Sequence, residues 1–322
     1  MIKIGIIGLG NVTWNVHLPI LLSRNDIKIS WICEINSEKK NVIEKKKIKF
    51  FNDLDDIINH EKVDIILITT PYSERIKIFD KVKTYCSGIF FEKPHALSLY
   101  EHKYFLNYLK SHAMTVGYSR RKMGIVKSMK KIINLNIFGN LRSIKIFFGD
   151  IHYRFDGFRS KVSKSGGGIF FEAGTHWLDC IFFTTNAKKI LNFESKKKFE
   201  SNLDIKSSGK FDLLDENNNQ FPCEFNFSIL ENTSNKIEYN FDNCSVDLYL
   251  FEEESNLKVK NNIKDEFLVQ DNEFLNYPFN SLDVGWSHWN DFLNSFKLNK
   301  ESDISFNSFY LTAEITELFY EK

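Results

Sequence analysis

The chain has 322 residues, of which 43% are hydrophobic and 26% are charged, ordinary values for a globular protein. This length exceeds what one hydrophobic core usually serves, so we expect two domains. The 43 Lys and Arg residues almost balance the 42 Asp and Glu residues, which leaves a formal net charge of +1. Such a balance excludes a general attraction to nucleic acid or to an anionic membrane surface.

The start of the chain, its apolar runs and its cysteines indicate the cellular compartment. The chain opens on an alternating β pattern rather than a secretory leader, and no apolar run approaches the ~20 residues of a membrane helix. The cysteines are far apart and form no CxxC pair, which argues against a disulfide framework and against a metal site. We therefore expect free thiols, no bound metal and a cytoplasmic location. The five cysteines are Cys33, Cys86, Cys180, Cys223 and Cys244.

The first 117 residues alternate between short β-branched runs and longer amphipathic runs. Residues 65–68 are apolar throughout, as is typical of a parallel strand buried on both faces. Repeated strand–helix–strand units predict a doubly wound parallel sheet, the Rossmann arrangement. The predicted strands cover residues 2–7, 27–33, 64–69, 88–91 and 115–117, and the predicted helices cover residues 14–22, 37–46, 73–85 and 98–112.

The pattern changes after Tyr118. A helix is predicted over 122–134, a strand over 141–148 and a helix over 171–183; alternating runs over 190–259 predict an antiparallel meander. Two helical patterns follow, at 285–296 and 306–320. The fold class is therefore α/β: a doubly wound Rossmann domain over 1–118 that binds a dinucleotide, then an α+β domain over 119–322 with a largely antiparallel open sheet for substrate binding and oligomerisation. The final helices can pack back on the first domain.

The first predicted strand ends in a glycine turn, Gly8-Leu9-Gly10, and Asn11 and Val12 follow where a helix can open. Glycine adopts backbone angles closed to other residues and lets a pyrophosphate approach the main chain. The free N–H groups at the helix start would bind that anion. Thr13 replaces the third glycine of the GxGxxG pattern, so an ordinary strand-to-helix turn remains the alternative.

Glu34 ends the second predicted strand. A carboxylate at this place can bind the ribose hydroxyls of an adenosine and repels a 2′-phosphate. The next residue is Ile35 rather than Arg, so no neighbouring cation favours NADP. We predict NAD as the cofactor, with a solvated Glu34 at a strand end as the alternative.

Several further segments carry a recognisable pattern: His17-Leu18-Pro19 after the glycine turn, Thr70-Pro71 after the third main strand, Glu92-Lys93-Pro94 after the next, and a glycine-rich run from Gly166 into His176-Trp177-Leu178-Asp179. Together they resemble the glucose–fructose oxidoreductase/inositol dehydrogenase family, or Gfo/Idh/MocA family. The resemblance runs in order from about residue 4 to residue 179.

The resemblance implies roles for single residues. Lys93 would contact substrate near the nicotinamide and assist proton transfer, on a turn or cis bond set by Pro94. His176 would be the general acid/base, which suits an imidazole that titrates near neutrality. Asp179, three residues later, would pair with a basic group or cap local structure. Thr70, Pro71, Glu92 and Lys93 would join Gly8, Gly10, Asn11, Val12 and Glu34 in the cofactor site.

Two positions depart from the family pattern. Glu172 stands where the family usually has an Asp that helps bind substrate and polarise the reacting centre, so the resemblance implies a catalytic role for it, and its arm is one methylene longer. A misplacement of about 1 Å can cost ~100-fold in rate. Either the substrate suits the longer arm or the activity is impaired. Arg75 stands where the family often has His, and we interpret it as local packing.

The substrate is less well defined. Family substrates are mostly sugars and their derivatives, and the loop 154–164 carries four cations against one acid. We expect Tyr118, Arg120, Arg159, Glu172, His176 and Lys93 to bind substrate. The cations of the loop favour an anionic sugar derivative as the substrate, such as a nucleotide-linked sugar in surface-glycan synthesis. The alternative for residues 154–164 is a solvated surface loop.

The alternatives to a sugar oxidoreductase are an NAD-dependent glycosidase that works by oxidation and elimination, and a non-catalytic NAD- or sugar-binding protein. The first would release a free sugar without accumulating NADH. The second would bind NAD without turnover. We expect no nucleic-acid partner and no membrane partner. An open sheet in the second domain favours a homodimer or homotetramer, as is common in the family.

Overall fold

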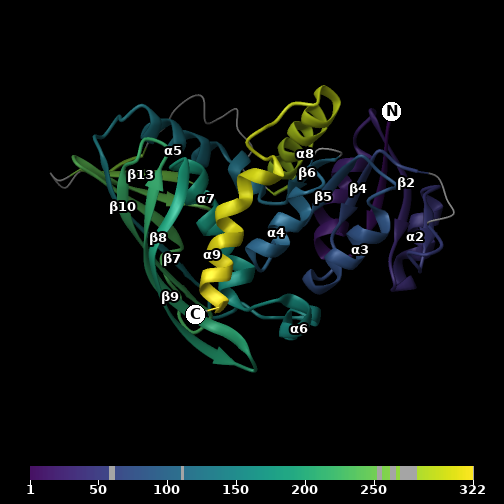
Figure 1. Ribbon diagram of the computed structural model, residues 1–322, viewed down its shortest axis with the longest axis horizontal. Helices are drawn as coiled ribbons and strands as arrows, with labels where there is room; N and C mark the ends of the chain where they lie inside the picture. Colours follow the sequence, from purple (N-terminus) through teal and green to yellow (C-terminus); the bar gives the residue numbers. More distant parts are fainter. Residues whose placement is uncertain (58–61, 110–111, 252–255, 262–265, 269–280, 322) are drawn as a thin grey trace. The chain divides into compact units, whose positions relative to one another are not determined.

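The computed structural model describes residues 1–57, 62–109, 112–251, 256–261, 266–268 and 281–321 (Figure 1). The chain forms two compact units. The first consists of Met1–His95, Tyr100–Gly117 and Ser281–Ser308, and the second of Ala96–Leu99, Tyr118–Asn280 and Phe309–Lys322. The described part of the chain contains no helix that is long and apolar enough to span a membrane. The assignment of cofactor binding to residues 1–118 and of substrate binding to 119–322 stays a prediction.

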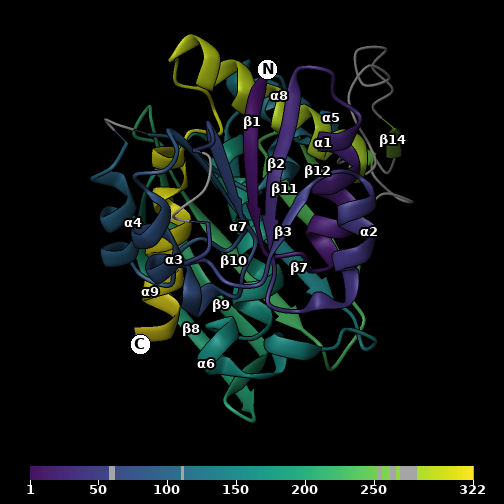
Figure 2. The same cartoon turned by 90° about the vertical axis from the view of Figure 1, so that its right-hand side faces the viewer.

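A six-stranded parallel sheet forms the centre of the first unit, which confirms the predicted doubly wound arrangement. Helices α1 (Leu18–Leu22) and α2 (Lys40–Lys45) cover one face, and α3 (Arg75–Val82) and α4 (Leu99–Leu106) the other (Figure 2). In spatial order the strands are β3 (Lys49–Phe51), β2 (Ile27–Cys33), β1 (Ile2–Ile7), β4 (Ile65–Ile68), β5 (Gly88–Phe91) and β6 (Ala113–Val116).

The first helix differs from the prediction because it opens with a π-helical turn, η1 (Thr13–His17), before α1. Pro19 lies in the first turn of α1 and has no N–H to donate, which interrupts α-helical hydrogen bonding there. The short strand β3 was not expected from the sequence. Residues 110 and 111, at the end of the predicted helix 98–112, lie outside the described residues.

A late segment completes the first unit. Helix α8 (Ser281–Leu298) packs against η1, α1 and β6. Its Trp289 is fully buried, and the indole stacks on Phe90 with ring centroids 4.5 Å apart. A Cβ added at Gly285 would lie 2.9 Å from the side chain of Ile20, so glycine permits the close approach of α8 to α1.

An eight-stranded mixed sheet forms the second unit, and its strands are mostly antiparallel, as predicted. The predicted meander over 190–259 is wrong at one point: β7 lies between β10 and β11, parallel to β10 and antiparallel to β11. Residues 252–255 of that stretch lie outside the described residues. In spatial order the strands are β14 (Glu266–Leu268), β13 (Asn256–Asn261), β12 (Cys244–Tyr249), β11 (Lys236–Phe241), β7 (Leu141–Gly149), β10 (Gln220–Ser228), β9 (Leu203–Asp215) and β8 (Ala187–Glu200).

Helices α5 (Gly124–Asn134), α7 (Thr175–Thr184) and α9 (Tyr310–Glu321) cover one face of this sheet (Figure 1). A second π-helical turn, η6 (Phe170–Gly174), leads into α7. Phe170 of this turn stacks on Phe319 of α9 with ring centroids 3.7 Å apart. The short helix α6 (Val162–Ser165) precedes the glycine run. The contact between Phe170 and Phe319 therefore fixes the start of α7 against α9.

Candidate active site

The glycine turn lies at the carboxyl end of β1, where the strand order reverses toward β4. Ligands of doubly wound sheets bind at such a point. Gly8 has φ of +98°, and a Cβ there would lie 2.6 Å from the Thr69 hydroxyl oxygen. A Cβ at Gly10 would meet nothing within 4 Å. The turn is thus closely packed at Gly8 and open at Gly10, which fits the approach of a pyrophosphate.

Thr13, in place of the third glycine, does not obstruct the turn. Its side chain is fully buried, and its hydroxyl oxygen lies 2.7 Å from that of Thr69. The Thr69 hydroxyl in turn donates to the carbonyl of Gly8 at 2.9 Å. Asn11 and Val12 are exposed beside it. The incomplete glycine pattern is therefore compatible with a dinucleotide.

Glu34 approaches this turn from the end of β2. Its carboxylate accepts the N–H of Leu9 at 2.6 Å and that of Asn36 at 3.0 Å. Lys39 also reaches the turn, because its ammonium donates to the Leu9 carbonyl at 3.1 Å and lies 4.5 Å from the centre of the Trp14 ring. This cation was not predicted from the sequence, because Lys39 lies in the helical turn that follows β2 and only its side chain returns to the glycine turn.

Thr70 and Pro71 follow β4 at the same edge of the sheet. The Thr70 hydroxyl oxygen is enclosed and has no hydrogen-bond partner among the described residues. A buried hydroxyl of this kind usually has a partner, so it marks a place for a polar group of a ligand. Together with the open face of Gly10 and the carboxylate of Glu34, it fits a bound dinucleotide.

Lys93 follows β5 and is half-buried. The Lys93–Pro94 peptide bond is cis. The Glu92 carboxylate accepts the Lys93 N–H at 3.1 Å, and the buried Arg75 guanidinium donates to the carbonyls of Glu92 and Pro94. Arg75 also donates to the Thr70 carbonyl at 3.2 Å. Arg75 therefore holds the backbone on either side of Lys93.

Glu92 is a buried carboxylate with a second neighbour, His17. The His17 Nε2 atom lies 2.9 Å from Glu92 Oε1, and the Trp289 indole donates to His17 Nδ1 at 2.9 Å. Burial acts to raise the pKa of Glu92, but the hydrogen bond from His17 and the charges of Lys93 and Arg75 outweigh it and lower the pKa below its ordinary value. No short-range signal in the sequence indicates the contact with Trp289.

In the second unit, Glu172 lies in η6 and His176 in the first turn of α7. Glu172 is only 6% exposed, and its Oε1 lies 3.7 Å from Arg159 Nε. The His176 ring meets the Tyr118 ring edge to face, with centroids 5.7 Å apart. The structure therefore brings together Glu172 with Arg159, and His176 with Tyr118. That these four residues bind one substrate stays a prediction.

Arg120 and Tyr153 belong to the same part of the second unit. The Arg120 guanidinium lies 5.3 Å from the Trp177 ring centre, and its enclosed Nη1 has no hydrogen-bond partner among the described residues. Burial lowers the pKa of Arg120. Burial, and then the charge of Glu172, raise the pKa of Tyr153. Tyr153 was not predicted as a site residue, because a lone Tyr in a loop belongs to no sequence pattern.

Two buried polar groups support this region. Arg121 donates to both oxygens of Asp179, at 2.8 Å and 2.6 Å, so Asp179 pairs with a base, one of the two roles expected for it. Asp204 of β9 accepts the N–H groups of Gly168 and Phe170, each at 2.7 Å, at the start of η6. Sequence spacing could not indicate Asp204, which lies more than 30 residues beyond the turn that it holds.

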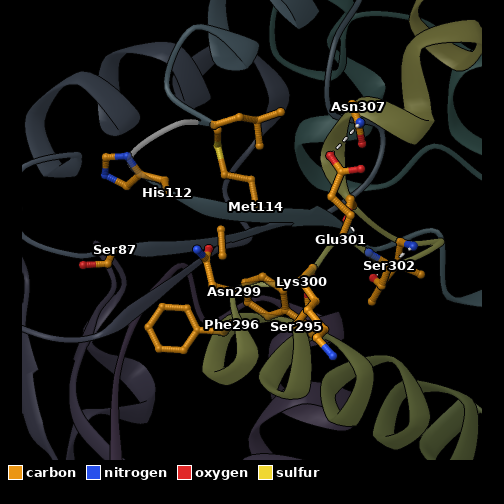
Figure 3. A pocket seen from close by; sticks show the side chains of 15 residues that line it. Ser87, His112, Met114, Ser295, Phe296, Asn299, Lys300, Glu301, Ser302 and Asn307 are labelled. Atoms are coloured by element: carbon orange, nitrogen blue, oxygen red, sulfur yellow. Dashed lines mark hydrogen bonds between the residues drawn. The ribbon is translucent and has the colours of Figure 1, made fainter.

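A cavity of about 380 Å³ in the first unit lies elsewhere (Figure 3). Its lining includes Ser87, directly before β5, and Met114 of β6, with Phe296 and Lys300 from α8 and the loop after it. It is therefore at the amino edge of the parallel sheet, opposite the glycine turn and Lys93.

In the described ranges no group of three or more His, Cys, Asp or Glu side chains is placed to hold a metal ion.

Comparisons with known proteins agree with these features. The sequence model of the GFO_IDH_MocA oxidoreductase family, with an NAD-binding Rossmann fold, matches residues 2–119. The D-xylose dehydrogenase of Paenarthrobacter nicotinovorans is 28% identical over 216 residues, which cover 61% of this chain and 53% of that protein. The chain thus spans about half the length of that curated relative.

Two solved structures share the fold at low sequence identity. The aldose–aldose oxidoreductase of Caulobacter crescentus, complexed with glycerol, has a TM-score of 0.84 at 14% identity and covers 99% of this chain and 96% of its own. A point mutant of the 3-ketoreductase KijD10 of Actinomadura kijaniata, complexed with TDP-benzene and NADP, has a TM-score of 0.80 at 11% identity, with 99% and 97% covered. Residues 2–119 therefore match the GFO_IDH_MocA oxidoreductase family with its NAD-binding Rossmann fold, and the whole chain is similar in fold to these two solved structures.

Proposed function

We propose that the protein is an NAD-dependent oxidoreductase that acts on a CH–OH group of a sugar derivative carrying an anionic group. The family and the open glycine turn with Glu34 support the redox chemistry. A bound nicotinamide would take the hydride from the carbinol carbon or return it. The chain itself has to bind the sugar, orient the carbon and move the hydroxyl proton.

Lys93 and His176 are the residues to which we assign that proton. Lys93 leaves the carboxyl end of a parallel strand on a backbone held by buried side chains, so its ammonium can be aimed at a hydroxyl. His176 is half-exposed in the first turn of α7, where an imidazole can accept or return a proton. Glu172 would bind the sugar through its carboxylate, with Arg159 at 3.7 Å to hold the arm.

The observation that carries the anionic substrate is Arg120. The Nη1 atom of its guanidinium is enclosed, Trp177 lies beside the guanidinium, and no carboxylate pairs with it in the part of the chain that the structure describes. Burying a cation without a counter-charge is costly, whereas Arg binds phosphate or carboxylate through two parallel hydrogen bonds. A sugar phosphate, a uronic acid or a nucleotide-linked sugar would supply this anion, and the last would suit surface-glycan synthesis.

We further propose that NAD is preferred over NADP. The Glu34 carboxylate would repel a 2′-phosphate, and Lys39 is engaged by the Leu9 carbonyl and the Trp14 ring. Titration with both cofactors tests this choice. Glu34→Ser should narrow the preference for NAD, and Lys39→Ala should leave NAD affinity within about 2-fold; NADP binding that is tighter than NAD in the unmodified protein would contradict it.

A matched substrate panel tests the function. We would follow NADH formation with a neutral hexose, its phosphate, its uronic acid and a nucleotide-linked hexose, for wild type and Arg120→Gln. Turnover of an anionic member that falls at least ~10-fold in Arg120→Gln, chiefly through KM, supports the proposal. Turnover of the neutral hexose alone would remove the anionic substrate, and free sugar released without NADH would favour the glycosidase reaction instead.

Two properties of the whole molecule complete the proposal. All five cysteines are free, which supports a reducing, cytoplasmic setting. We propose a homodimer or homotetramer through the outer face of the eight-stranded sheet, as in the family. That face carries cross-strand ion pairs such as Lys236–Asp247 at 2.8 Å and Lys210–Glu194 at 3.1 Å, so it is more polar than we expected. A monomer in light scattering would contradict the oligomer.

A further inference from the structure

We propose that a buried set of side chains, His17, Glu92, Arg75 and Trp289, acts as a clamp that positions Lys93. The set lies wholly within the first unit, and it brings residues from η1, α3 and α8 together with the residue that directly follows β5. The inference rests on the proposed function only in giving Lys93 a part in the reaction. The clamp itself follows from hydrogen bonds and burial.

The first step concerns the tautomer of His17. The Trp289 indole can only donate a hydrogen bond, and it lies 2.9 Å from His17 Nδ1, so that nitrogen carries no proton. The ring proton is therefore on Nε2, which donates to Glu92 Oε1 at 2.9 Å. His17 is 4% exposed and Trp289 is fully buried, so water does not compete for either bond. Trp289 thus selects the one neutral tautomer that can orient Glu92.

The second step concerns the space around the Glu92 carboxylate. A Cβ added at Gly117, just after β6, would lie 2.5 Å from Glu92 Oε1. The carboxylate therefore fills the space that a side chain at position 117 would need. Its other oxygen accepts the Lys93 N–H at 3.1 Å. With one oxygen held by His17 and the other by Lys93, the Glu92 side chain has one orientation.

The third step concerns the backbone on both sides of Lys93. Arg75 is 5% exposed, and its guanidinium donates to the carbonyls of Glu92 and Pro94. Buried groups therefore hold the N–H of Lys93 and the carbonyls before and after it. The side chains that orient metal ligands change affinity or activity 10–100-fold when removed, and we expect an effect of that size for groups that orient Lys93.

The central experiment compares two substitutions of His17. His17→Leu removes the donor to Glu92, whereas His17→Gln offers an amide N–H in a similar place. We expect kcat to fall ~10–100-fold in His17→Leu, with the Kd for NAD within about 2-fold, and to recover most of the loss in His17→Gln. Phe292→Leu is the matched control, because Phe292 is a buried residue of the same helix as Trp289 and contacts the same Phe90 ring.

A double-mutant cycle separates positioning from a general loss of structure. If His17 acts through Lys93, His17→Leu should lower kcat no further in a Lys93→Met background. A further fall of the same size in that background would overturn the proposal. Trp289→Phe provides a second variant if His17→Leu does not fold, since it keeps a ring against Phe90 and removes only the indole donor; we expect an intermediate loss of kcat.

Hydrogen exchange of the Lys93 amide tests the clamp without any turnover. The exchange rate should rise at least ~10-fold in His17→Leu relative to wild type and stay near the wild-type rate in Phe292→Leu. An unchanged rate in His17→Leu would overturn the clamp. If the wild type turns over no sugar while the exchange result holds, the proposed function fails and the clamp stands.

Discussion

Lys93 and His176, the two residues assigned to proton transfer, are held by different means. Lys93 lies on a turn between β5 and α4, and two buried charged side chains, Arg75 and Glu92, bind its backbone. His176 lies in a helix, whose own hydrogen bonds fix its backbone. The supporting groups act on the turn before the helix and on Asp179, one turn after His176. A turn has few internal hydrogen bonds, so buried polar side chains supply what a helix supplies by itself.

This difference predicts what each unit loses when a supporting polar group is removed. In the first unit, removing a polar group should move Lys93 while the surrounding core stays packed. In the second unit, the corresponding polar groups are embedded among helices, so their removal should first reduce the free energy of unfolding. The predictions below run from the largest expected effect to the smallest.

The largest effect is expected at the Arg121–Asp179 pair. Arg121→Leu would leave the Asp179 carboxylate buried and uncompensated, since Asp179 is 1% exposed. Breaking such a pair from one side costs about 3–5 kcal/mol. Urea unfolding measures this loss. The exposed pair of Arg142 and Asp242 is the matched control, because Arg142→Leu should leave the free energy of unfolding nearly unchanged; equal losses in both variants would contradict the account.

A second prediction concerns acid and belongs to the first unit. His102 is fully buried with its Nδ1 at 2.8 Å from His95 Nε2, and burial lowers its pKa to about 4. The unfolded chain binds a proton near pH 6.5 and the folded chain near pH 4, so stability is complete above about pH 6.5 and falls as the pH drops toward 4. The total loss should be about 3 kcal/mol.

Urea unfolding near pH 7 and near pH 4 checks this, with His102→Leu as the comparison. The variant cannot take up the proton, so the pH-dependent loss should shrink by most of that amount. If His102→Leu loses as much stability between pH 7 and pH 4 as the wild type does, groups other than His102 cause the loss.

The smallest of these effects is expected at Glu172. Its carboxylate is 3.7 Å from Arg159 Nε, and the arm of Asp would be one methylene shorter. If the substrate suits the longer arm, Glu172→Asp should lower kcat/KM ~10–100-fold, a shift of ~1 Å being enough for that range. Steady-state kinetics measure it. A rise in kcat/KM on this substitution would show instead that Glu172 impairs the activity of the protein.

The sequence was sufficient to predict the parallel sheet of the first unit and most of its strands. Apolar runs such as residues 65–68 and the glycine turn are local signals, and they predicted the doubly wound sheet that the structure shows. The position of β7 between β10 and β11 was not predictable, because strand order depends on which apolar faces meet and not on the alternation within each strand.

The same limit applies to the candidate site. Motif residues such as Lys93 and His176 were predicted from a resemblance, and their places in the structure are compatible with the proposed roles. Their supporting groups were missed: Trp289 is 272 residues from His17, and Asp204 is 34 residues from Phe170. These contacts come from tertiary packing, for which a single sequence carries no local pattern.

The most direct test of the account is single-turnover NADH formation with the anionic substrate found in the panel, for wild type, Lys93→Met and His176→Asn. We predict that the rate of hydride transfer at saturating NAD falls ~10²–10⁴-fold in each variant, and that His176→Asn binds NAD with a Kd within about 2-fold of wild type. Hydride transfer at the wild-type rate in either variant would contradict the assignment of the proton to these two residues.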